Sequence, residues 1–250
     1  MTSAPLLAVD GLARRFGAVT ALSGVSFTAA ARERRAIIGP NGAGKTTLFN
    51  VITGEITPTA GRIVFGGRSI VGLTPHAVAR RGISRSFQRT NLFPRLTVQE
   101  NVRLAAAADG RGSYDLFGRG GARREAQLRR ADAIADAVGL AARLGDVAGR
   151  LSYGEQRQLE VGVALATGPK LLLLDEPTAG MSPEETQRMT SMLAGLPRDV
   201  AVLIIEHDMD VVASLADRVT VLHHGEVLTE GTFAEVKADP RVYDVYLGAA

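Results

Sequence analysis

One glycine-rich segment constrains the fold of this 250-residue chain more than any other feature. It fits the pattern Gly-x-x-x-x-Gly-Lys-Ser/Thr at every fixed position. The apolar run Ala36-Ile37-Ile38 precedes it, and a helical spacing of apolar residues runs from Lys45 to Thr53. A strand, a glycine turn and a helix in this order predict a phosphate-binding loop. The residues expected to bind there are Gly39, Pro40, Asn41, Gly42, Ala43, Gly44, Lys45, Thr46 and Thr47.

The chemistry of this loop follows from its residue types. Glycines let backbone N–H groups converge on phosphate oxygens, and the helix N-terminus adds partial positive charge. Lys45 brings a full positive charge toward the β- and γ-phosphates, and the hydroxyl of Thr46 is a ligand for Mg²⁺. We therefore expect ATP and Mg²⁺ as cofactors.

A second motif supplies carboxylates. The apolar run Leu171–Leu174 is typical of a buried parallel strand, and Asp175 and Glu176 follow it directly. The carboxyl ends of such strands form the ligand-binding edge of α/β sheets. We expect Asp175 to hold Mg²⁺ and Glu176 to accept a proton from an attacking water.

Composition and charge narrow the class of protein. The chain has no cysteine, which excludes disulfides, thiolate metal sites and a cysteine nucleophile. Residues 1–150 carry 22 basic and 10 acidic side chains, whereas residues 151–250 carry 7 and 16. This bias could reflect an anionic ligand, or simply a preference for arginine as the surface cation. The sequence shows neither a long apolar run that could span a bilayer nor a basic leader before an apolar stretch.

The order of apolar segments predicts an α/β fold with a parallel sheet. The alternating pattern over residues 7–28 indicates short strands at the N-terminus, and residues 99–145, rich in Ala and Arg, indicate an inserted helical part. A capping box at Ser182 and Glu185 predicts a further helix.

Further motifs are similar to those of ABC-transporter ATPases, whose signature is usually Leu-Ser-Gly-Gly-Gln. The segment Leu151-Ser152-Tyr153-Gly154-Glu155-Gln156 resembles that signature, and it precedes Glu176 at the family's spacing. Gln88 resembles the glutamine of the family's Q-loop, His207 its switch histidine, and Phe16 the aromatic residue that stacks on adenine.

The resemblance implies a role for each of these residues. Gln88 would contact Mg²⁺ or the attacking water, and His207 would bind a γ-phosphate oxygen. Ser152 and Gly154 would bind the γ-phosphate of ATP held by a second ATPase subunit, in a homo- or heterodimer, so that one chain alone hydrolyses poorly.

The resemblance also implies an organisation and a location. The expected fold is a phosphate-loop NTPase core with a parallel sheet, an N-terminal antiparallel β subdomain and an inserted helical subdomain. The whole chain would be one ATPase domain, with a core at about residues 1–88 and 165–235, a helical insertion at 89–164 and a tail at 236–250. It would lie in the cytoplasm, peripheral on the inner face of the cell membrane.

The expected partners are integral membrane permease subunits, with an external solute-binding protein in the complex and no nucleic acid. The permease contact is expected near Gln88 and in the following Arg89–Glu100, where Leu92, Phe93, Pro94 and Leu96 are apolar.

Departures from the usual pattern point to a subfamily. Tyr153 replaces a glycine and Glu155 a glutamine, and the segment from Thr178 to Ser182 lacks the aspartate of the usual D-loop. These features resemble ATPase subunits of branched-chain amino-acid importers. Importers of urea or other small polar solutes and lipopolysaccharide-export ATPases are similar. A nucleic-acid-associated ATPase and a non-catalytic nucleotide binder remain as other classes, but the pair Glu176 and His207 disfavours the second.

Overall fold

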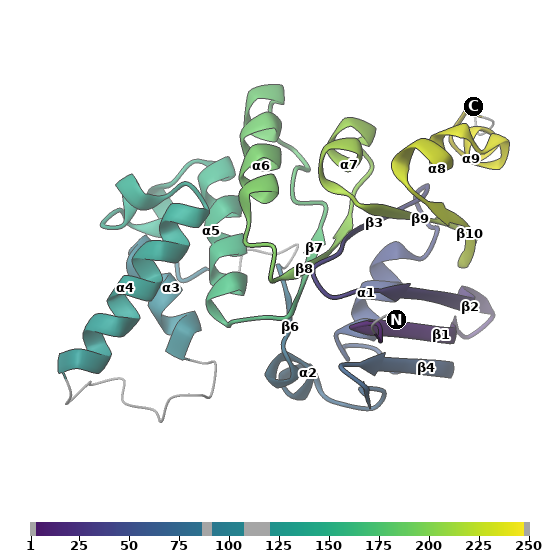
Figure 1. Cartoon of the computed structure of the whole chain (residues 1–250), viewed down its shortest axis with the longest axis horizontal. Coiled ribbons are helices and arrows are strands. Elements are labelled where there is room, and N and C mark those ends of the chain that lie inside the picture. The colour runs from purple at the N-terminus through teal and green to yellow at the C-terminus, as the bar shows by residue number, and fades with distance from the viewer. Residues whose placement is uncertain (1–3, 87–91, 108–120, 248–250) are drawn as a thin grey trace. The chain divides into compact units, whose positions relative to one another are not determined.

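The computed structural model describes residues 4–86, 92–107 and 121–247 (Figure 1). The chain divides into two units. The first consists of the residues up to Ile83 together with those from Arg198 onward, and the second consists of Ser84–Pro197. The first unit therefore combines two distant parts of the sequence, and it carries most of the strands.

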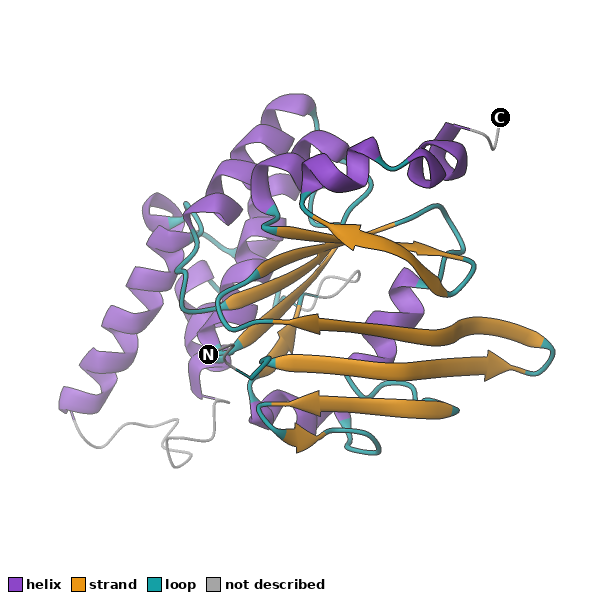
Figure 2. Ribbon diagram, turned by 45° about the vertical axis from the view of Figure 1, so that its right-hand side comes forward, coloured by secondary structure: helices purple, strands orange, loops and turns teal. Residues whose placement is uncertain are grey.

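An antiparallel sheet occupies the N-terminal part of the first unit (Figure 2). Its strand order is β2-β1-β4-β5. Along β2, Val25, Phe27 and Ala29 are buried, because alternate side chains of a strand share one face, and Leu22 is also buried beyond a shift in register. The strands are β1 (Leu7–Phe16), β2 (Val19–Ala29), β4 (Ala60–Phe65) and β5 (Arg68–Ser69).

A second sheet of the first unit is mostly parallel. In it, β3 (Arg34–Ile38) runs parallel to β8 (Ala201–Ile205) on one side and to β9 (Arg218–His223) on the other. All five residues of β3 and of β8 are buried, as expected for strands covered on both faces. The edge strand β10 (Glu226–Gly231) pairs antiparallel with β9. The helices of this unit are α1 (Lys45–Ile52), α2 (Pro75–Arg81), α7 (Met209–Leu215), α8 (Phe233–Ala238) and α9 (Pro240–Leu247).

The second unit is mainly helical. Three of its helices, α3, α4 and α5, contact one another around a core of small and medium apolar side chains. Its strands, β6 and β7, are neighbours, and Ser86 N–H donates to the carbonyl of Leu173 at 2.9 Å. The elements are β6 (Ile83–Arg85), α3 (Val98–Ala107), α4 (Gly121–Ala137), the 3₁₀ turns η1 (Ala141–Arg143) and η2 (Ala148–Arg150), α5 (Tyr153–Ala166), β7 (Leu171–Asp175) and α6 (Pro183–Gly195).

The fold class expected from the sequence is confirmed: an α/β core with parallel strands, an antiparallel β part and a helical part. The capping box at the start of α6 is also present, since Glu185 N–H donates to Ser182 Oγ and Ser182 N–H donates to the Glu185 carboxylate. Within the described ranges, no helix has the length and apolar character needed to cross a bilayer.

Candidate active site

The phosphate loop connects β3 to α1 in the first unit. Its glycines take up the left-handed backbone region, with φ of 80° at Gly42 and 102° at Gly44. A side-chain carbon on Gly44 would lie only 2.5 Å from the carbonyl oxygen of Ala21, so glycine is required there. Gly44 is also the N-cap of α1, and no side chain in the described part of the chain caps this helix. The first N–H groups of α1 are therefore suited to an external acceptor such as a phosphate.

Lys45, the first residue of α1, is folded back over the loop. Its side chain is buried, and Nζ donates to the carbonyl oxygens of Gly39 at 2.6 Å and of Pro40 at 3.0 Å. These acceptors are neutral, whereas a phosphate oxygen carries charge and makes a stronger bond with the ammonium group. Thr46 is exposed and Thr47 is half-buried at the start of the helix. The loop is thus in a conformation that can receive an anion.

His207 follows the strand beside the phosphate loop. In the parallel pair β3 and β8, Ile37 lies opposite Ile205, so Gly39 and His207 each come two residues later at the same edge of the sheet. The His207 side chain is 62% exposed, and its Nδ1 lies 4.0 Å from Glu206 Oε2. An exposed imidazole at this edge can hydrogen-bond a phosphate oxygen.

Phe16 is the last residue of β1, and its ring is 43% exposed. The guanidinium carbon of Arg14 lies 4.5 Å from the ring centroid, while Arg14 also donates to the carbonyl oxygen of Thr57 at 2.8 Å. Arg14 therefore covers one face of the ring. An adenine base would have to stack on the other face, and this role for Phe16 stays a prediction.

In the second unit, Asp175 ends β7 with its carboxylate buried. Oδ2 accepts a bond from Arg85 at 2.6 Å, and the two side chains are only 1% and 6% exposed. Oδ1 is buried and has no hydrogen-bond partner among the described residues. An unpartnered buried carboxylate oxygen is costly, and it is a suitable ligand for Mg²⁺ or for a water of its hydration shell. Asp175 therefore fits the metal role expected from the sequence.

Glu176 leaves the strand in an unusual conformation. Its φ is 47°, in the left-handed region that non-glycine residues rarely occupy. Such strain costs on the order of 1–3 kcal/mol and tends to occur at functional sites. The turn that follows is closed by the N–H of Ala179, which donates to the carbonyl oxygen of Glu176 at 3.1 Å. The half-buried Glu176 is thus fixed at its backbone.

Ser152 caps the N-terminus of α5. Glu155 N–H donates to Ser152 Oγ at 3.3 Å, and Ser152 N–H donates to Glu155 Oε2 at 2.9 Å. That backbone bond, helped by Arg143 at 3.1 Å, holds the pKa of Glu155 below its usual range. The Ser152 hydroxyl still has its own proton to donate to an anion. Arg143 offsets the negative charge that Glu155 brings to this helix end.

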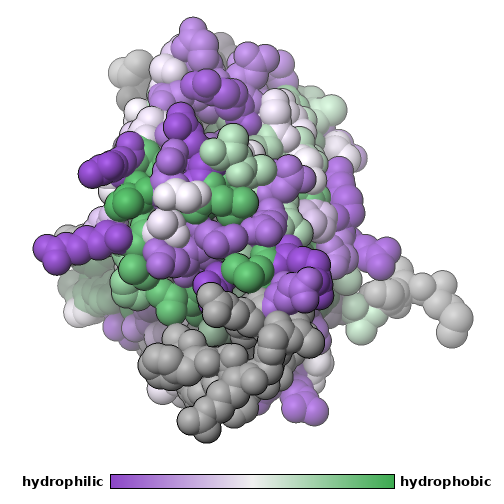
Figure 3. Space-filling model, turned by 90° about the vertical axis from the view of Figure 1, so that its left-hand side faces the viewer, coloured by the Kyte–Doolittle hydropathy of each residue, from purple (hydrophilic) through white to green (hydrophobic). Residues whose placement is uncertain are grey.

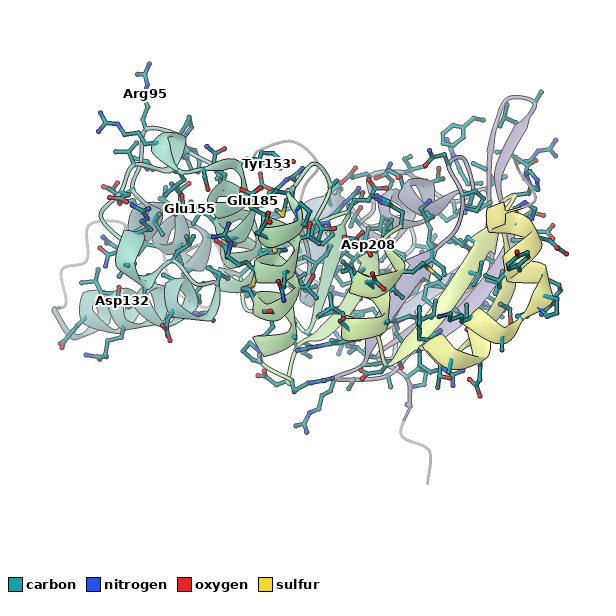
Figure 4. All side chains as sticks on the ribbon, turned by 90° about the horizontal axis from the view of Figure 1, so that it is seen from above. Arg95, Asp132, Tyr153, Glu155, Glu185 and Asp208 are labelled. Carbon is teal, nitrogen blue, oxygen red and sulfur yellow. The ribbon has the colours of Figure 1, made fainter. Side chains whose placement is uncertain are left out.

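Gly154 lies close to the start of α6. A side-chain carbon on it would come within 3.2 Å of Glu185 Oε1, so a larger residue would press on the capping box of that helix. Figure 4 shows Tyr153, Glu155 and Glu185 gathered in this region. Ser152, Gly154 and Glu185 also line a cavity of about 220 Å³. The signature segment thus has room for a ligand group beside its helix N-terminus.

The predicted site residues fall in both units. The phosphate loop, Phe16 and His207 belong to the first unit, and Ser152, Gly154, Asp175 and Glu176 belong to the second. Gln88 lies outside the described residues.

Sequence reasoning missed two groups in the second unit. Arg85 was not expected as the partner of Asp175, because the two are 90 residues apart and nothing distinguishes Arg85 from the other arginines. The hydrogen bond from the Tyr153 hydroxyl to the carbonyl oxygen of Ala179 could not be expected from the sequence either. The only signal was that Tyr153 departs from the usual glycine.

Comparisons with known proteins identify the family of the chain. The family model described as ABC transporter matches residues 22–179, and the model described as branched-chain amino acid ATP-binding cassette transporter matches residues 226–250. The chain is 41% identical over 254 aligned residues to the high-affinity branched-chain amino acid transport ATP-binding protein LivG of Salmonella typhimurium. The alignment covers 99% of this chain and all of LivG.

Solved structures are similar as well. One is a nucleotide-free ATP-binding cassette from an ABC transporter, with 32% identity, a TM-score of 0.84, and coverage of 98% of this chain and 100% of that one. Another is a dimeric ATP-binding cassette in a post-hydrolysis state bound to ADP and Pi, with 26% identity, a TM-score of 0.76, and coverage of 91% and 98%. The resemblance inferred from the motifs is confirmed, and the chain belongs to the ABC transporter family as one of its ATP-binding, ATP-hydrolysing subunits.

Proposed function

We propose that this chain hydrolyses Mg²⁺-bound ATP to drive the import of branched-chain amino acids through separate membrane subunits. The observation that carries the nucleotide site is the phosphate loop. Its glycines adopt left-handed conformations, none of the described side chains caps the N-terminus of α1, and Lys45 is folded over the loop. In this geometry the backbone donors of the loop can face the phosphates of ATP, and the Lys45 ammonium can exchange its neutral carbonyl acceptors for charged phosphate oxygens.

Thr46 and Asp175 hold the Mg²⁺ in this proposal. The buried Oδ1 of Asp175 supports the assignment, because it has no hydrogen-bond partner within the described ranges and an oxygen of that kind suits a hydrated divalent cation. When bound, the ion neutralises charge that develops on the phosphates. Arg85 keeps the other carboxylate oxygen occupied, so that Asp175 presents one defined oxygen.

Glu176 is the general base. It accepts a proton from the water that attacks the γ-phosphate, and its turn fixes the backbone while it does so. His207 donates a hydrogen bond to a γ-phosphate oxygen. Gln88 orients the attacking water or contacts the metal ion. Phe16 stacks on the adenine ring.

A second ATPase subunit completes each nucleotide site. Ser152 and Gly154 offer a hydroxyl proton and the N-terminus of α5 to the γ-phosphate of ATP bound by the partner chain. The similar cassette that forms a dimer with ADP and Pi supports this arrangement. ATP binding then draws two chains together, and hydrolysis and phosphate release separate them.

The contact with the membrane subunits involves the segment before and within α3. Phe93 and Pro94 are exposed, Leu96 is half-buried and Leu92 is buried, so the apolar surface there is small. Figure 3 shows apolar residues in small groups among hydrophilic ones on the side of the second unit that bears α3 and α4. Such a surface suits a protein partner, and in this proposal the chain lies peripherally, on the cytoplasmic face of the membrane. An external solute-binding protein delivers the amino acid to the membrane subunits.

The similarity to LivG over nearly the full chain supports the amino acid as substrate. Uptake of radiolabelled leucine and of urea, measured in the source organism before and after deletion of the coding sequence, tests it. We expect leucine uptake to fall and urea uptake to stay unchanged. Rescue is expected from the wild-type sequence but not from Glu176→Gln. Loss of urea uptake alone would contradict the assignment and favour the polar-solute importer.

A further inference from the structure

Tyr153 connects the signature segment to the turn after Glu176. It is the first residue of α5, directly after the capping Ser152, and 47% of it is exposed. Its hydroxyl donates to the carbonyl oxygen of Ala179 at 3.2 Å. The signature segment and this turn are 26 residues apart in sequence, and the hydroxyl of Tyr153 joins them directly.

The turn that receives this bond also holds the proposed base. Ala179 accepts from Tyr153 through its carbonyl oxygen and donates through its N–H to the carbonyl oxygen of Glu176 at 3.1 Å. The two contacts are therefore made by the same residue, on the two sides of its Cα atom. Next to it, Gly180 has a φ of 77°, and a side-chain carbon there would be 3.8 Å from the tyrosine ring. A shift of Tyr153 would act on the backbone that orients Glu176.

The tyrosine is itself held from the body of α5. Arg157 Nε donates to the Tyr153 hydroxyl at 3.1 Å, and the guanidinium carbon lies 5.3 Å from the ring centroid. Arg157 also pairs with the buried Glu160 at 3.0 Å. A cationic donor polarises the hydroxyl and strengthens the bond that the hydroxyl gives. The chain Glu160–Arg157–Tyr153–Ala179 is thus a continuous polar connection along the first turns of α5.

We propose that Tyr153 is a positioning residue that couples the anion-binding start of α5 to Glu176 of the same chain. The inference rests on the proposed function, in which Ser152 contacts ATP held by the partner. Binding of that γ-phosphate fixes the first turn of α5, and Tyr153 transmits the restraint to Glu176. A glycine at this position, as in the usual signature, has no side chain that could do so.

The test is the replacement Tyr153→Phe, which removes the hydroxyl and keeps the ring. Tyr243→Phe is the matched control, because Tyr243 is exposed in α9 and has no place in the proposed machinery. In the full-length dimer we expect Tyr153→Phe to lower kcat about three- to tenfold, the effect of one lost hydrogen bond. We expect the KM for ATP and the affinity of the single chain for nucleotide to stay unchanged, and the thermal midpoint to fall by no more than about 6 °C.

Mixed dimers distinguish an effect of Tyr153 on Glu176 of the same chain from an effect on Ser152, which contacts the ATP held by the other chain. One chain carries Tyr153→Phe and the other carries Glu176→Gln, so only the first chain has a working base, while the signature facing its ATP is intact. Coupling predicts that this dimer turns over ATP about three- to tenfold more slowly than a dimer of one wild-type chain and one Glu176→Gln chain. Unchanged turnover there would overturn the inference. Failure of the wild-type dimer to hydrolyse ATP would instead overturn the proposed function, so the two failures can be told apart.

Discussion

Loss of the buried ion pair between Arg85 and Asp175 is expected to lower the free energy of unfolding strongly. Replacing Arg85 by methionine leaves a carboxylate that is 1% exposed without its cation. Removing one partner of a buried pair typically costs about 3–5 kcal/mol in the free energy of unfolding. For a chain of this length, each kcal/mol lowers the thermal midpoint by roughly 2–4 °C. We therefore expect a drop of roughly 6–20 °C, measured by circular dichroism without nucleotide.

The exposed pair between Arg62 and Asp10 is the matched control. Its N–O distance is 3.1 Å, but the two side chains are 79% and 65% exposed. Such pairs contribute less than about 1 kcal/mol, so Arg62→Met should shift the midpoint by at most a few degrees. The double replacement Arg85→Met with Asp175→Asn leaves no charge at this buried pair and should recover at least half of the loss. Equal midpoints for Arg85→Met and Arg62→Met would refute this reasoning.

Two further predictions concern nucleotide binding. Lys45→Ala should weaken binding of a fluorescent ATP analogue at least about tenfold, because the phosphates lose a charged partner. The exposed Lys170→Ala is the control, and normal affinity in Lys45→Ala would contradict the loop assignment. Ser152→Ala in one chain of a mixed dimer should impair hydrolysis mainly of the ATP held by the other chain. A defect confined to the nucleotide of the mutated chain would exclude the shared site.

Local patterns were sufficient to predict much of the fold. The phosphate loop, the apolar strand β7 and the capping box of α6 are each encoded within a few adjacent residues, and all three are present. The short helix α2 gave a weaker signal. Its Thr74 cap and its proline in the first turn are recognisable only once the helix is known, since one buried residue, Val78, does not make an apolar stripe.

The candidate site was predictable only in part. Its motifs are encoded in adjacent residues, whereas its tertiary contacts join segments that are far apart in the sequence. The family signature identified Ser152, and the two carboxylates at the end of an apolar run identified Asp175 and Glu176. The partner of Asp175, by contrast, comes from the neighbouring strand β6, and the contact of Tyr153 with Ala179 depends on how α5 packs near β7. Contacts between segments distant in sequence leave no periodic signal in a single sequence. The roles of the individual site residues stay predictions.

The central claim is that two of these chains share Mg²⁺-bound ATP, with Glu176 as the base. The most direct measurement is the molar mass of Glu176→Gln by light scattering, with and without Mg²⁺ and ATP, alongside its rate of phosphate release. The account predicts a change from 26.3 kDa to twice that mass on addition of Mg²⁺ and ATP, with phosphate release abolished. A mass that stays at 26.3 kDa, or phosphate release at the wild-type rate, would contradict it.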